Sequence, residues 1–378
     1  MIKIPFNRPY HTGREREHIL AALDGRRTQG DGPYTRRAES MLQELTGAAR
    51  VLLTASGTDA LEMAVLLSGV GPGDEVLMPS YTFVSTATAV VLRGATPVFF
   101  DISPETLNCD AARLEECLTP RTKAIMPVHY AGFSCDMDRL MEFAESHKLL
   151  VIEDAAHAIG AKRGGRPLGS WGQMAAFSFH ETKNISCGEG GALAINDPAL
   201  VERAEIIRDK GTNRRKFLRG EVDKYTWVDL GSSFLSGELP AAMLVGQLEH
   251  VHDINERRAR IFSDYMRGLG GLETNGRIVL PRPGINEQGN GHIFHVLVES
   301  NRVREAMRLA LMDQGIQTTS HYEPLHASPA GRRFGRVAGP VNQTDSCAGR
   351  MLRLPIYPDL IKSEQEQVIS AIWDFFAR

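Results

Sequence analysis

Short apolar runs alternate with amphipathic stretches from about residue 50 to residue 200. Within each run the apolar residues are consecutive, which is typical of strands covered on both faces. The runs lie at residues 51–53, 75–78, 97–101, 123–128, 149–153, 175–179 and 192–196. Helical patterns at 58–67 and 136–147 separate some of them. This alternation predicts an α/β domain with a mostly parallel sheet between two layers of helices.

The pattern changes after about residue 200. A charged helical stretch at 200–210 leads into a polar segment at 211–225, which we expect to be a loop. The remaining expected elements are two helices at 240–249 and 255–269, segments at 292–299 and 317–320, a helix at 303–314 and a C-terminal helix. Ser363 and Glu366 have the spacing of a capping box at the start of that last helix. We therefore predict a large domain over residues 1–245 and a smaller α+β domain over 246–378.

The composition narrows the class of protein. The chain has 378 residues, 42% of them apolar and 24% charged, as in an ordinary globular protein. Its formal net charge of −3 argues against a dedicated nucleic-acid binder, which would normally be basic. No apolar run approaches the roughly 18 residues of a membrane span, and the first residues lack the pattern of a secretory signal. We expect a cytoplasmic protein without nucleic-acid or membrane partners.

The cysteines and histidines do not suggest a metal site. The five cysteines lie far apart and form no CxxC pair, and the histidines form no HExxH motif. An odd number of scattered cysteines favours free thiols over a disulfide framework. We expect no bound metal.

Three segments carry candidate chemistry. In Thr54-Ala-Ser-Gly-Thr-Asp-Ala60 a strand runs straight into a helix capped by Ser56, and Gly57 allows a ligand to approach the backbone. Such a helix start suits a phosphate, although an ordinary capped helix would have the same sequence. The segment is neither a Walker A loop nor a GxGxxG motif, so it does not indicate a nucleoside triphosphate or a dinucleotide.

The other two segments each follow a buried strand. Asp154 comes after residues 149–153, at the sheet edge where open α/β sheets bind ligands, but it would equally cap a following helix. Lys183 comes after residues 177–179 and before a glycine-rich turn at 188–191. Most lysines are simply exposed, but this one has small and apolar neighbours, which favours a functional role.

Together these segments supply what one cofactor needs. Pyridoxal 5'-phosphate (PLP) requires a phosphate site, a carboxylate for its ring nitrogen and an amine for its aldehyde. A helix start at Gly57, the carboxylate of Asp154 and the amine of Lys183 match these three needs.

The order of motifs resembles the DegT/DnrJ/EryC1/StrS family of fold-type I, PLP-dependent sugar aminotransferases. The motifs, which cover nearly the whole chain, are Ser56-Gly-Thr58, Pro79-Ser-Tyr-Thr-Phe83, Pro127-Val-His129, Glu153-Asp-Ala-Ala-His157, Ser178-Phe-x-x-x-Lys183, Gly188-Glu-Gly-Gly191, His321-Tyr-Glu-Pro-Leu-His326 and Leu354-Pro355.

The resemblance implies roles for particular residues. It makes Lys183 the Schiff-base lysine and Asp154 the partner of the ring nitrogen. His157 would contact the phenolic oxygen of PLP, and Phe83 would stack on its ring. Gly57, Thr58 and Ser178 would hold the phosphate, while His129 would orient the wall of the site. Where many relatives read Gly-Tyr-Asn-Tyr-Arg, this chain has Gly231-Ser-Ser-Phe-Leu235, so Ser233 would replace the asparagine that reaches the neighbouring subunit's phosphate.

The resemblance also implies the substrates. Stretches such as Lys210-Gly-Thr-Asn-Arg214 and Val222-Asp-Lys-Tyr-Thr-Trp227 resemble the subgroup that aminates C4 of TDP-4-keto-6-deoxy-D-glucose in enterobacterial common antigen synthesis. L-glutamate is the usual donor of the family, and a homodimer with shared active sites is its usual assembly. Candidate anchors for the TDP-linked keto sugar are Arg214, Arg215, Lys224, His321 and Tyr322, although the first three would equally form a solvated loop face.

Three other functions remain open. The first is amination at C3, or of another nucleotide-linked keto sugar. The second is a sugar dehydratase of the same fold, in which a histidine replaces the lysine, so Lys183 argues against it. The third is a non-catalytic regulatory member of the family, which the presence of both Lys183 and Asp154 disfavours.

Overall fold

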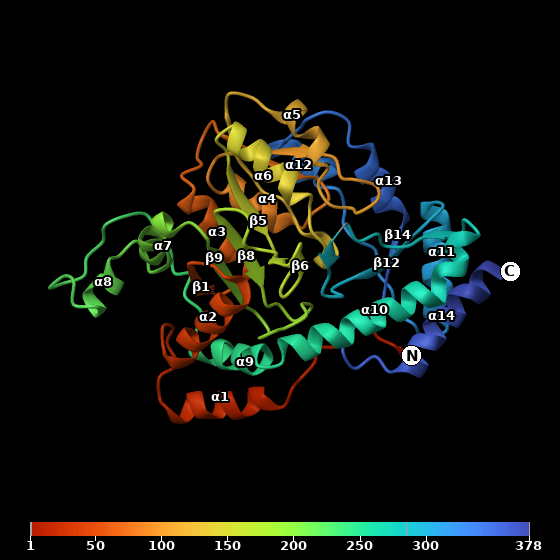
Figure 1. Cartoon of the computed structure of the whole chain (residues 1–378), viewed down its shortest axis with the longest axis horizontal. Coiled ribbons are helices and arrows are strands. Elements are labelled where there is room, and N and C mark those ends of the chain that lie inside the picture. The colour runs from red at the N-terminus through yellow and green to blue at the C-terminus, as the bar shows by residue number, and fades with distance from the viewer. Residues whose placement is uncertain (1, 285, 378) are drawn as a thin grey trace.

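A computed structural model describes residues 2–284 and 286–377. Its centre is an eight-stranded sheet with the order β1-β9-β8-β5-β4-β2-β3-β13 (Figure 1). The strands are β1 (Arg50–Thr54), β2 (Glu75–Pro79), β3 (Thr96–Phe100), β4 (Thr122–Ile125), β5 (Leu150–Asp154), β8 (Met174–Ser178), β9 (Gly191–Ile195) and β13 (Arg336–Val337). Only β9 runs antiparallel to its neighbours in this sheet. The predicted mostly parallel sheet is confirmed, as is each of the seven predicted strands.

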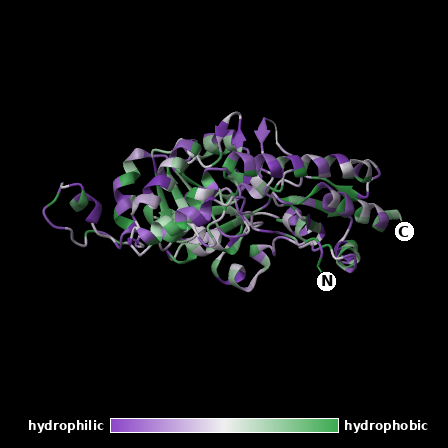
Figure 2. Cartoon of the chain, turned by 90° about the horizontal axis from the view of Figure 1, so that it is seen from below, coloured by the Kyte–Doolittle hydropathy of each residue, from purple (hydrophilic) through white to green (hydrophobic). Residues whose placement is uncertain are grey.

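Helices cover both faces of this sheet because successive side chains of each strand point to opposite sides. Leu52 of β1 packs with α3 (Gly57–Leu67), α4 (Val84–Val91) and α7 (Val201–Arg208) on one face. Its neighbours Val51 and Leu53 pack on the other face, where α2 (Pro33–Thr46) and α9 (Glu238–Leu248) lie. Beyond them that face is covered by α5 (Leu114–Cys117) and α6 (Met137–Ser146). Figure 2 shows the hydrophobic residues gathered inside these layers.

A second, antiparallel sheet lies toward the C-terminus. It has the order β10 (Ile278–Val279), β12 (Phe294–Val298), β14 (Met351–Leu354) and is covered by α10 (Val251–Thr274), α11 (Asn301–Asp313) and α14 (Lys362–Ala377). Ile4 near the N-terminus also belongs to this core.

Helix α10 takes part in two hydrophobic cores. Val251 and Ile254 pack into the core of the large sheet, whereas Tyr265 and Leu269 pack into the core of the second sheet. In Figure 1 this helix runs from α9 to the C-terminal end of the molecule. The division at residue 245 stays a prediction.

Two expectations about local structure were wrong. The segment 211–225 is not entirely a loop, because it contains the short helix α8 (Arg214–Leu218). Ser363 does not cap the last helix, which already begins at Lys362. Instead Glu364 accepts a hydrogen bond from the backbone N–H of Ile361 at 3.3 Å, so the cap lies two residues earlier than predicted.

Several helices and short strands escaped the pattern reading. They are α1 (Arg14–Asp24), α2, α4, α5, α12 (Pro329–Phe334), α13 (Asn342–Arg350), β6 (Lys162–Arg163), β7 (Arg166–Pro167), β10, β11 (Glu287–Gln288), β13 and β14. β14 matters for the site because it carries Arg353.

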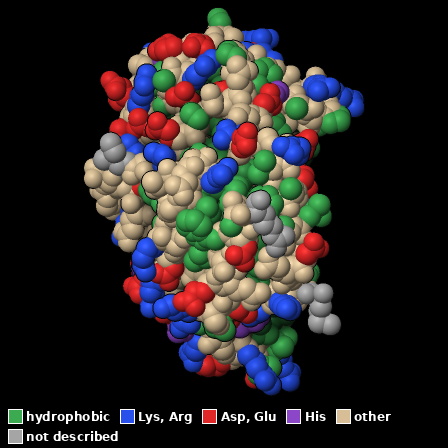
Figure 3. Space-filling model, turned by 90° about the vertical axis from the view of Figure 1, so that its right-hand side faces the viewer, with side chains coloured by type: hydrophobic (Ala, Val, Ile, Leu, Met, Phe, Trp, Pro, Cys, Tyr) green, Lys and Arg blue, Asp and Glu red, His purple; other side chains and the backbone are tan. Residues whose placement is uncertain are grey.

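The cysteines, the helix lengths and the charged side chains of the described residues bear on the expectations from composition. All five cysteines are buried and free. In residues 2–284 and 286–377, no helix is long and apolar enough to cross a membrane. No group of three or more His, Cys, Asp or Glu side chains in the same ranges could hold a metal ion. Figure 3 shows basic and acidic side chains interspersed over the C-terminal face.

Candidate active site

A cavity of about 560 Å³ lies at the carboxyl edge of the large sheet. The loops that follow the parallel strands begin at this edge, and ligands usually bind there in such sheets. Strands β5 and β8 end here at Asp154 and Ser178, and β1 leads here into α3. The predicted residues that line it are Gly57, Thr58, Phe83, Asp154, His157, Ser178, Lys183, His321 and Tyr322.

The start of α3 forms one wall. Ser56 caps the helix by accepting a hydrogen bond from the Asp59 N–H at 3.0 Å, and Thr58 Oγ1 lies 2.7 Å from Ser85 Oγ. Gly57 lies so close to β8 that a Cβ added there would be 2.7 Å from the Cβ of Ser178. A helix start, a glycine without a side chain and two hydroxyls therefore surround a space that suits a phosphate.

Asp154 is held at the end of β5 by two hydrogen bonds. Thr86 Oγ1 donates to Oδ2 at 2.7 Å, and the N–H of Ala156 donates to Oδ1 at 3.2 Å. These bonds fix the carboxylate in the cavity wall, where it can face a protonated ring nitrogen.

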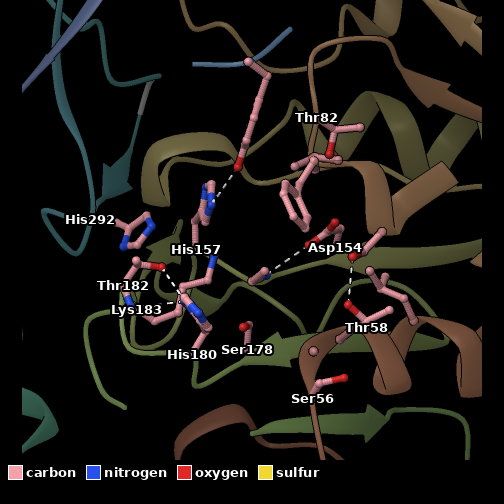
Figure 4. A pocket seen from close by; sticks show the side chains of 18 of the residues that line it. Ser56, Thr58, Thr82, Asp154, His157, Ser178, His180, Thr182, Lys183 and His292 are labelled. Atoms are coloured by element: carbon pink, nitrogen blue, oxygen red, sulfur yellow. Dashed lines mark hydrogen bonds between the residues drawn. The ribbon is translucent and has the colours of Figure 1, made fainter. Parts of the chain in front are cut away.

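Lys183 lies on the turn after β8, where its N–H donates to the carbonyl of His180 at 2.9 Å. In Figure 4, Lys183 and His157 lie on one side of an open space, and Asp154 and Thr58 lie on the other. Burial lowers the pKa of Lys183 to about 8. The charge of Asp154 raises this pKa, and the charge of Arg353 lowers it further. With this pKa about a tenth of the lysine is neutral at pH 7, far more than for an ordinary lysine, and the neutral amine is the form that acts as a nucleophile or base.

His157 and Tyr322 close another side of the cavity. Tyr322 Oη lies 3.3 Å from His157 Nε2, and the rings of His321 and Tyr322 are in contact, with centroids 3.5 Å apart. Burial lowers the pKa of His157 and of His321, so both rings are neutral. His157 Nδ1 is buried and has no hydrogen-bond partner among the described residues. A phenolic oxygen of a cofactor would supply that partner.

His129 lies behind the site and not in its wall. Its Nε2 is 2.7 Å from Glu153 Oε2, and both side chains are fully buried. Although burial opposes protonation, hydrogen bonds with Cys135 and Glu153 raise the pKa of His129 to about 10. Glu153 also accepts backbone hydrogen bonds from Gly169, Trp171 and Gly172 at 2.7–2.8 Å.

The other predicted residues do not reach the cavity of their own chain. Arg214 pairs with Asp209 at 3.2 Å, and Arg215 pairs with Asp31 at 2.6 Å. Ser233 forms a backbone bridge with Asp209, and Lys224 is exposed. Arg214 and Arg215 begin α8, which projects from the left of the molecule in Figure 1, whereas Lys224 and Ser233 follow it along the chain.

Several residues of the cavity were not predicted. They are Phe6, Leu61, Thr82, Ser85, Val128, Ala156, Ala176, His180, Thr182, Glu189, His292 and Arg353. Four of them, Thr82, Val128, Ala156 and Glu189, lie inside motifs quoted in the sequence analysis, so the motifs themselves were a usable signal. Phe6, His292 and Arg353 are far away along the chain and reach the cavity only through the tertiary fold.

The donors in the cavity fit PLP. The start of α3 suits the phosphate, Asp154 suits the ring nitrogen, the orphaned Nδ1 of His157 suits the phenolic oxygen, and Lys183 supplies an amine. These features lie around one space rather than at separate places, as binding of a single cofactor requires.

Comparisons with known proteins show the family of the chain. The sequence matches the model of the DegT/DnrJ/EryC1/StrS aminotransferase family over residues 9–373. A protein of Geobacillus stearothermophilus named "Pleiotropic regulatory protein" is 35% identical over 347 residues, which are 91% of this chain and 90% of that protein. Among solved structures, S. venezuelae DesV is 34% identical with a TM-score of 0.91, and each chain covers 100% of the other. The putative sugar aminotransferase Spr1654 of Streptococcus pneumoniae, in its PMP-form, is 26% identical with a TM-score of 0.92, over 99% of each chain.

The family match spans nearly the whole chain, and the similar structures share its full length. The protein therefore belongs to the DegT/DnrJ/EryC1/StrS aminotransferase family and is a PLP-dependent aminotransferase of fold type I.

Proposed function

We propose that this protein transfers the amino group of L-glutamate to C4 of TDP-4-keto-6-deoxy-D-glucose. The products are 2-oxoglutarate and TDP-4-amino-4,6-dideoxy-D-galactose. The observation that carries the proposal is that Lys183 faces Asp154 across a cavity whose third wall is the start of α3. The volume of about 560 Å³ is within the roughly 300–1,000 Å³ of small-molecule sites.

When bound, PLP supplies an aldehyde for the amine and a protonated ring that accepts electrons from the donor's Cα. Lys183 is the residue whose Nζ would hold that aldehyde. When free, the same Nζ would take the proton from Cα of the donor, and in the acceptor half-reaction it would deliver a proton to C4 of the sugar. Asp154 holds its negative charge where it favours a cationic ring, and Thr86 fixes that carboxylate.

Aromatic residues line part of the cavity. Phe83 at the start of α4 is 55% exposed and lies beside Tyr322, with ring centroids 6.2 Å apart. We assign to Phe83 the stacking on the cofactor ring. Tyr322 and His321 would contact the sugar, because both line the cavity from the side of the second sheet.

We further propose that two copies of the chain share their active sites. Residues 211–231, here called the projecting segment, expose several large apolar side chains, which on a monomer would be an unusual patch. These are Phe217, Leu218, Tyr225, Trp227, Val228 and Leu230. Docking this segment on a second copy would bury them and would bring Arg214, Arg215, Lys224 and Ser233 toward that copy's cavity.

Sedimentation velocity tests the assembly. Trp227 is 75% exposed, so Trp227→Asp leaves the fold intact and should shift the protein to monomers. Leu309, 54% exposed on α11 at the other end of the molecule, is the matched control, and Leu309→Asp should not alter the assembly. If the protein without any substitution sediments as a monomer, the proposal of a shared active site is contradicted.

Product analysis tests the reaction. The purified protein is incubated with L-glutamate and TDP-4-keto-6-deoxy-D-glucose, and the product is determined by NMR. An axial amine at C4 is expected. An equatorial amine, or an amine at C3, would move the assignment to a related sugar aminotransferase. Lys183→Ala should abolish turnover, whereas Lys123→Ala, a change of an exposed lysine on β4, should not.

A regulatory role is the second candidate, because one relative bears the name of a regulatory protein. The depressed pKa of Lys183, at about 8, favours catalysis, since a protein that does not use its cofactor has no need of a reactive amine. Borohydride reduction of the PLP-treated protein followed by peptide mapping tests the requirement for catalysis, and a protein without label would favour the regulatory role. Catalysis requires the label on the peptide that contains Lys183.

A further inference from the structure

A cationic side chain lies in the cavity without an anion. Arg353 belongs to β14, where Leu352 and Leu354 point into the core of the second sheet. The alternation of a strand turns Arg353 to the opposite side, and there it lines the cavity. The second sheet thereby places a guanidinium in the same cavity as the amine of Lys183.

The groups around Arg353 do not neutralise it. Its Nε is buried and has no hydrogen-bond partner among the described residues. Its guanidinium carbon lies 4.6 Å from the centre of the Phe6 ring. The titratable groups that affect its pKa are the phenols of Tyr81, Tyr130 and Tyr322, none of them a carboxylate.

The other neighbours of Arg353 are neutral or positively charged. Burial lowers the pKa of His157, His292, His295 and His321, and the charge of Arg353 lowers each of them further. Burial raises the pKa of Tyr81, Tyr130 and Tyr322, so these phenols are uncharged. The two carboxylates of the cavity are both engaged elsewhere, Asp154 with Thr86 and Glu189 with His180 at 3.6 Å.

Arg353 is half-buried, and a guanidinium partly withdrawn from water without a counter-ion is costly. An arginine in this position is therefore built for an anion that arrives with a ligand. Its planar fork fits the two oxygens of a carboxylate, and such charge-assisted pairs are among the strongest hydrogen bonds in proteins.

We propose that Arg353 binds the α-carboxylate of the amino donor and so orients the donor amine toward the cofactor. This inference rests on the proposed aminotransfer and extends it to the residue that recognises the donor. In an α-amino acid the carboxylate and the amine are on the same carbon, so the carboxylate must bind close to Lys183. The charge of Arg353 lowers the pKa of Lys183, which places the two cations within electrostatic reach.

The keto sugar nucleotide is the other anionic substrate. Its diphosphate is separated from the reacting C4 by the width of the sugar ring and by the glycosidic oxygen. A cation close to Lys183 is therefore better placed for the donor than for the diphosphate. Since the two substrates use the cavity in turn, loss of Arg353 should impair the donor half of the reaction and spare the acceptor half.

Binding of probes to the PLP-loaded protein tests this without turnover. Glutarate carries the donor's carboxylates but no amine, and TDP carries the nucleotide diphosphate; both are titrated by calorimetry. For Arg353→Met we expect the Kd of glutarate to rise by roughly 10- to 100-fold and that of TDP to change less than twofold. Arg353→Lys keeps the positive charge but lacks the paired N–H donors of the guanidinium. Its affinity for glutarate should therefore lie between those of the unsubstituted protein and Arg353→Met.

The matched control removes a different arginine that also stacks on an aromatic ring. Arg8 lies 5.1 Å from the centre of the Tyr357 ring and does not line the cavity. Arg8→Met should leave the Kd of glutarate unchanged. Single-turnover measurements add a kinetic readout. Arg353→Met should slow the reaction of L-glutamate with the PLP form, and the reaction of the keto sugar with the aminated form should keep its rate.

Three results would overturn the proposal. The first is an unchanged Kd of glutarate in Arg353→Met. The second is an equal loss of TDP affinity, which would assign Arg353 to the diphosphate. The third is an equal loss in Arg8→Met, which would indicate a general effect on the fold. Failure of the proposed sugar reaction would be seen separately, since the glutarate measurement needs no acceptor.

Discussion

Gly57 provides a sharp test of the phosphate site. An alanine there would place its Cβ 2.7 Å from the Cβ and 3.0 Å from the Oγ of Ser178. Since carbon atoms in contact prefer roughly 3.5–4.0 Å, the methyl group intrudes by about 1 Å. Overpacking of this size costs about 1–3 kcal/mol. Alanine is favoured over glycine in helices by up to about 1 kcal/mol, so the steric cost exceeds the gain.

The strain should appear in cofactor binding, because the methyl group pushes Ser178 away from the phosphate space. We expect Gly57→Ala to weaken binding of PLP by about 1–2 kcal/mol, which corresponds to roughly 5- to 30-fold in Kd. The assay is titration of the PLP-free protein with PLP, followed by absorbance. Gly270 in α10 is the matched control, because a Cβ there meets nothing within 4 Å. Gly270→Ala should bind PLP normally and raise the melting temperature.

An unchanged affinity for PLP in Gly57→Ala would refute the assignment of the phosphate to this helix start. Equal losses in both variants would mean that the effect comes from general stability and not from the close contact with Ser178.

Three further predictions concern the charged groups of the site. The rate of PLP uptake by the PLP-free protein should rise with pH and be half-maximal near pH 8, because the pKa of Lys183 is lowered to about 8; half-maximal uptake near the ordinary 10.5 would contradict this. Glu153→Gln removes the partner of His129 and should lower stability by about 2–4 kcal/mol in urea unfolding at pH 7. Because the pKa of His129 is raised to about 10, the stabilisation is complete below its ordinary pKa of 6.5 and is lost as the pH rises through 10, so the difference between the two proteins should shrink there. Thr86→Val removes a donor to Asp154 and should slow the glutamate half-reaction about tenfold, whereas Thr86→Ser should keep the rate.

The strands, and the positions of Asp154 and Lys183 in the cavity, were predictable because their signals are local. Each buried run of the large sheet shows in its own few residues, and Asp154 and Lys183 each follow such a run directly. The sheet edge then brings them together, since carboxyl ends of parallel strands share one side.

Arg353 could not be predicted in this way. The sequence Met-Leu-Arg-Leu reads as a short strand with one outward polar residue, which is normally solvent-facing. Only the packing of the second sheet against the large one turns that side toward the cavity. Helix α8 was not predicted for a different reason. Its polar sequence resembles that of a loop, and its apolar residues are exposed.

The long helix α10 has a consequence for the chain as a whole. Since one continuous rod contributes Val251 and Ile254 to one core and Tyr265 and Leu269 to the other, the two cores should melt together. If the chain is divided at residue 245, the N-terminal fragment lacks α10. Apolar side chains of both fragments are then exposed to water. We expect neither fragment to fold when produced alone, and co-expression of the two to restore a single native assembly.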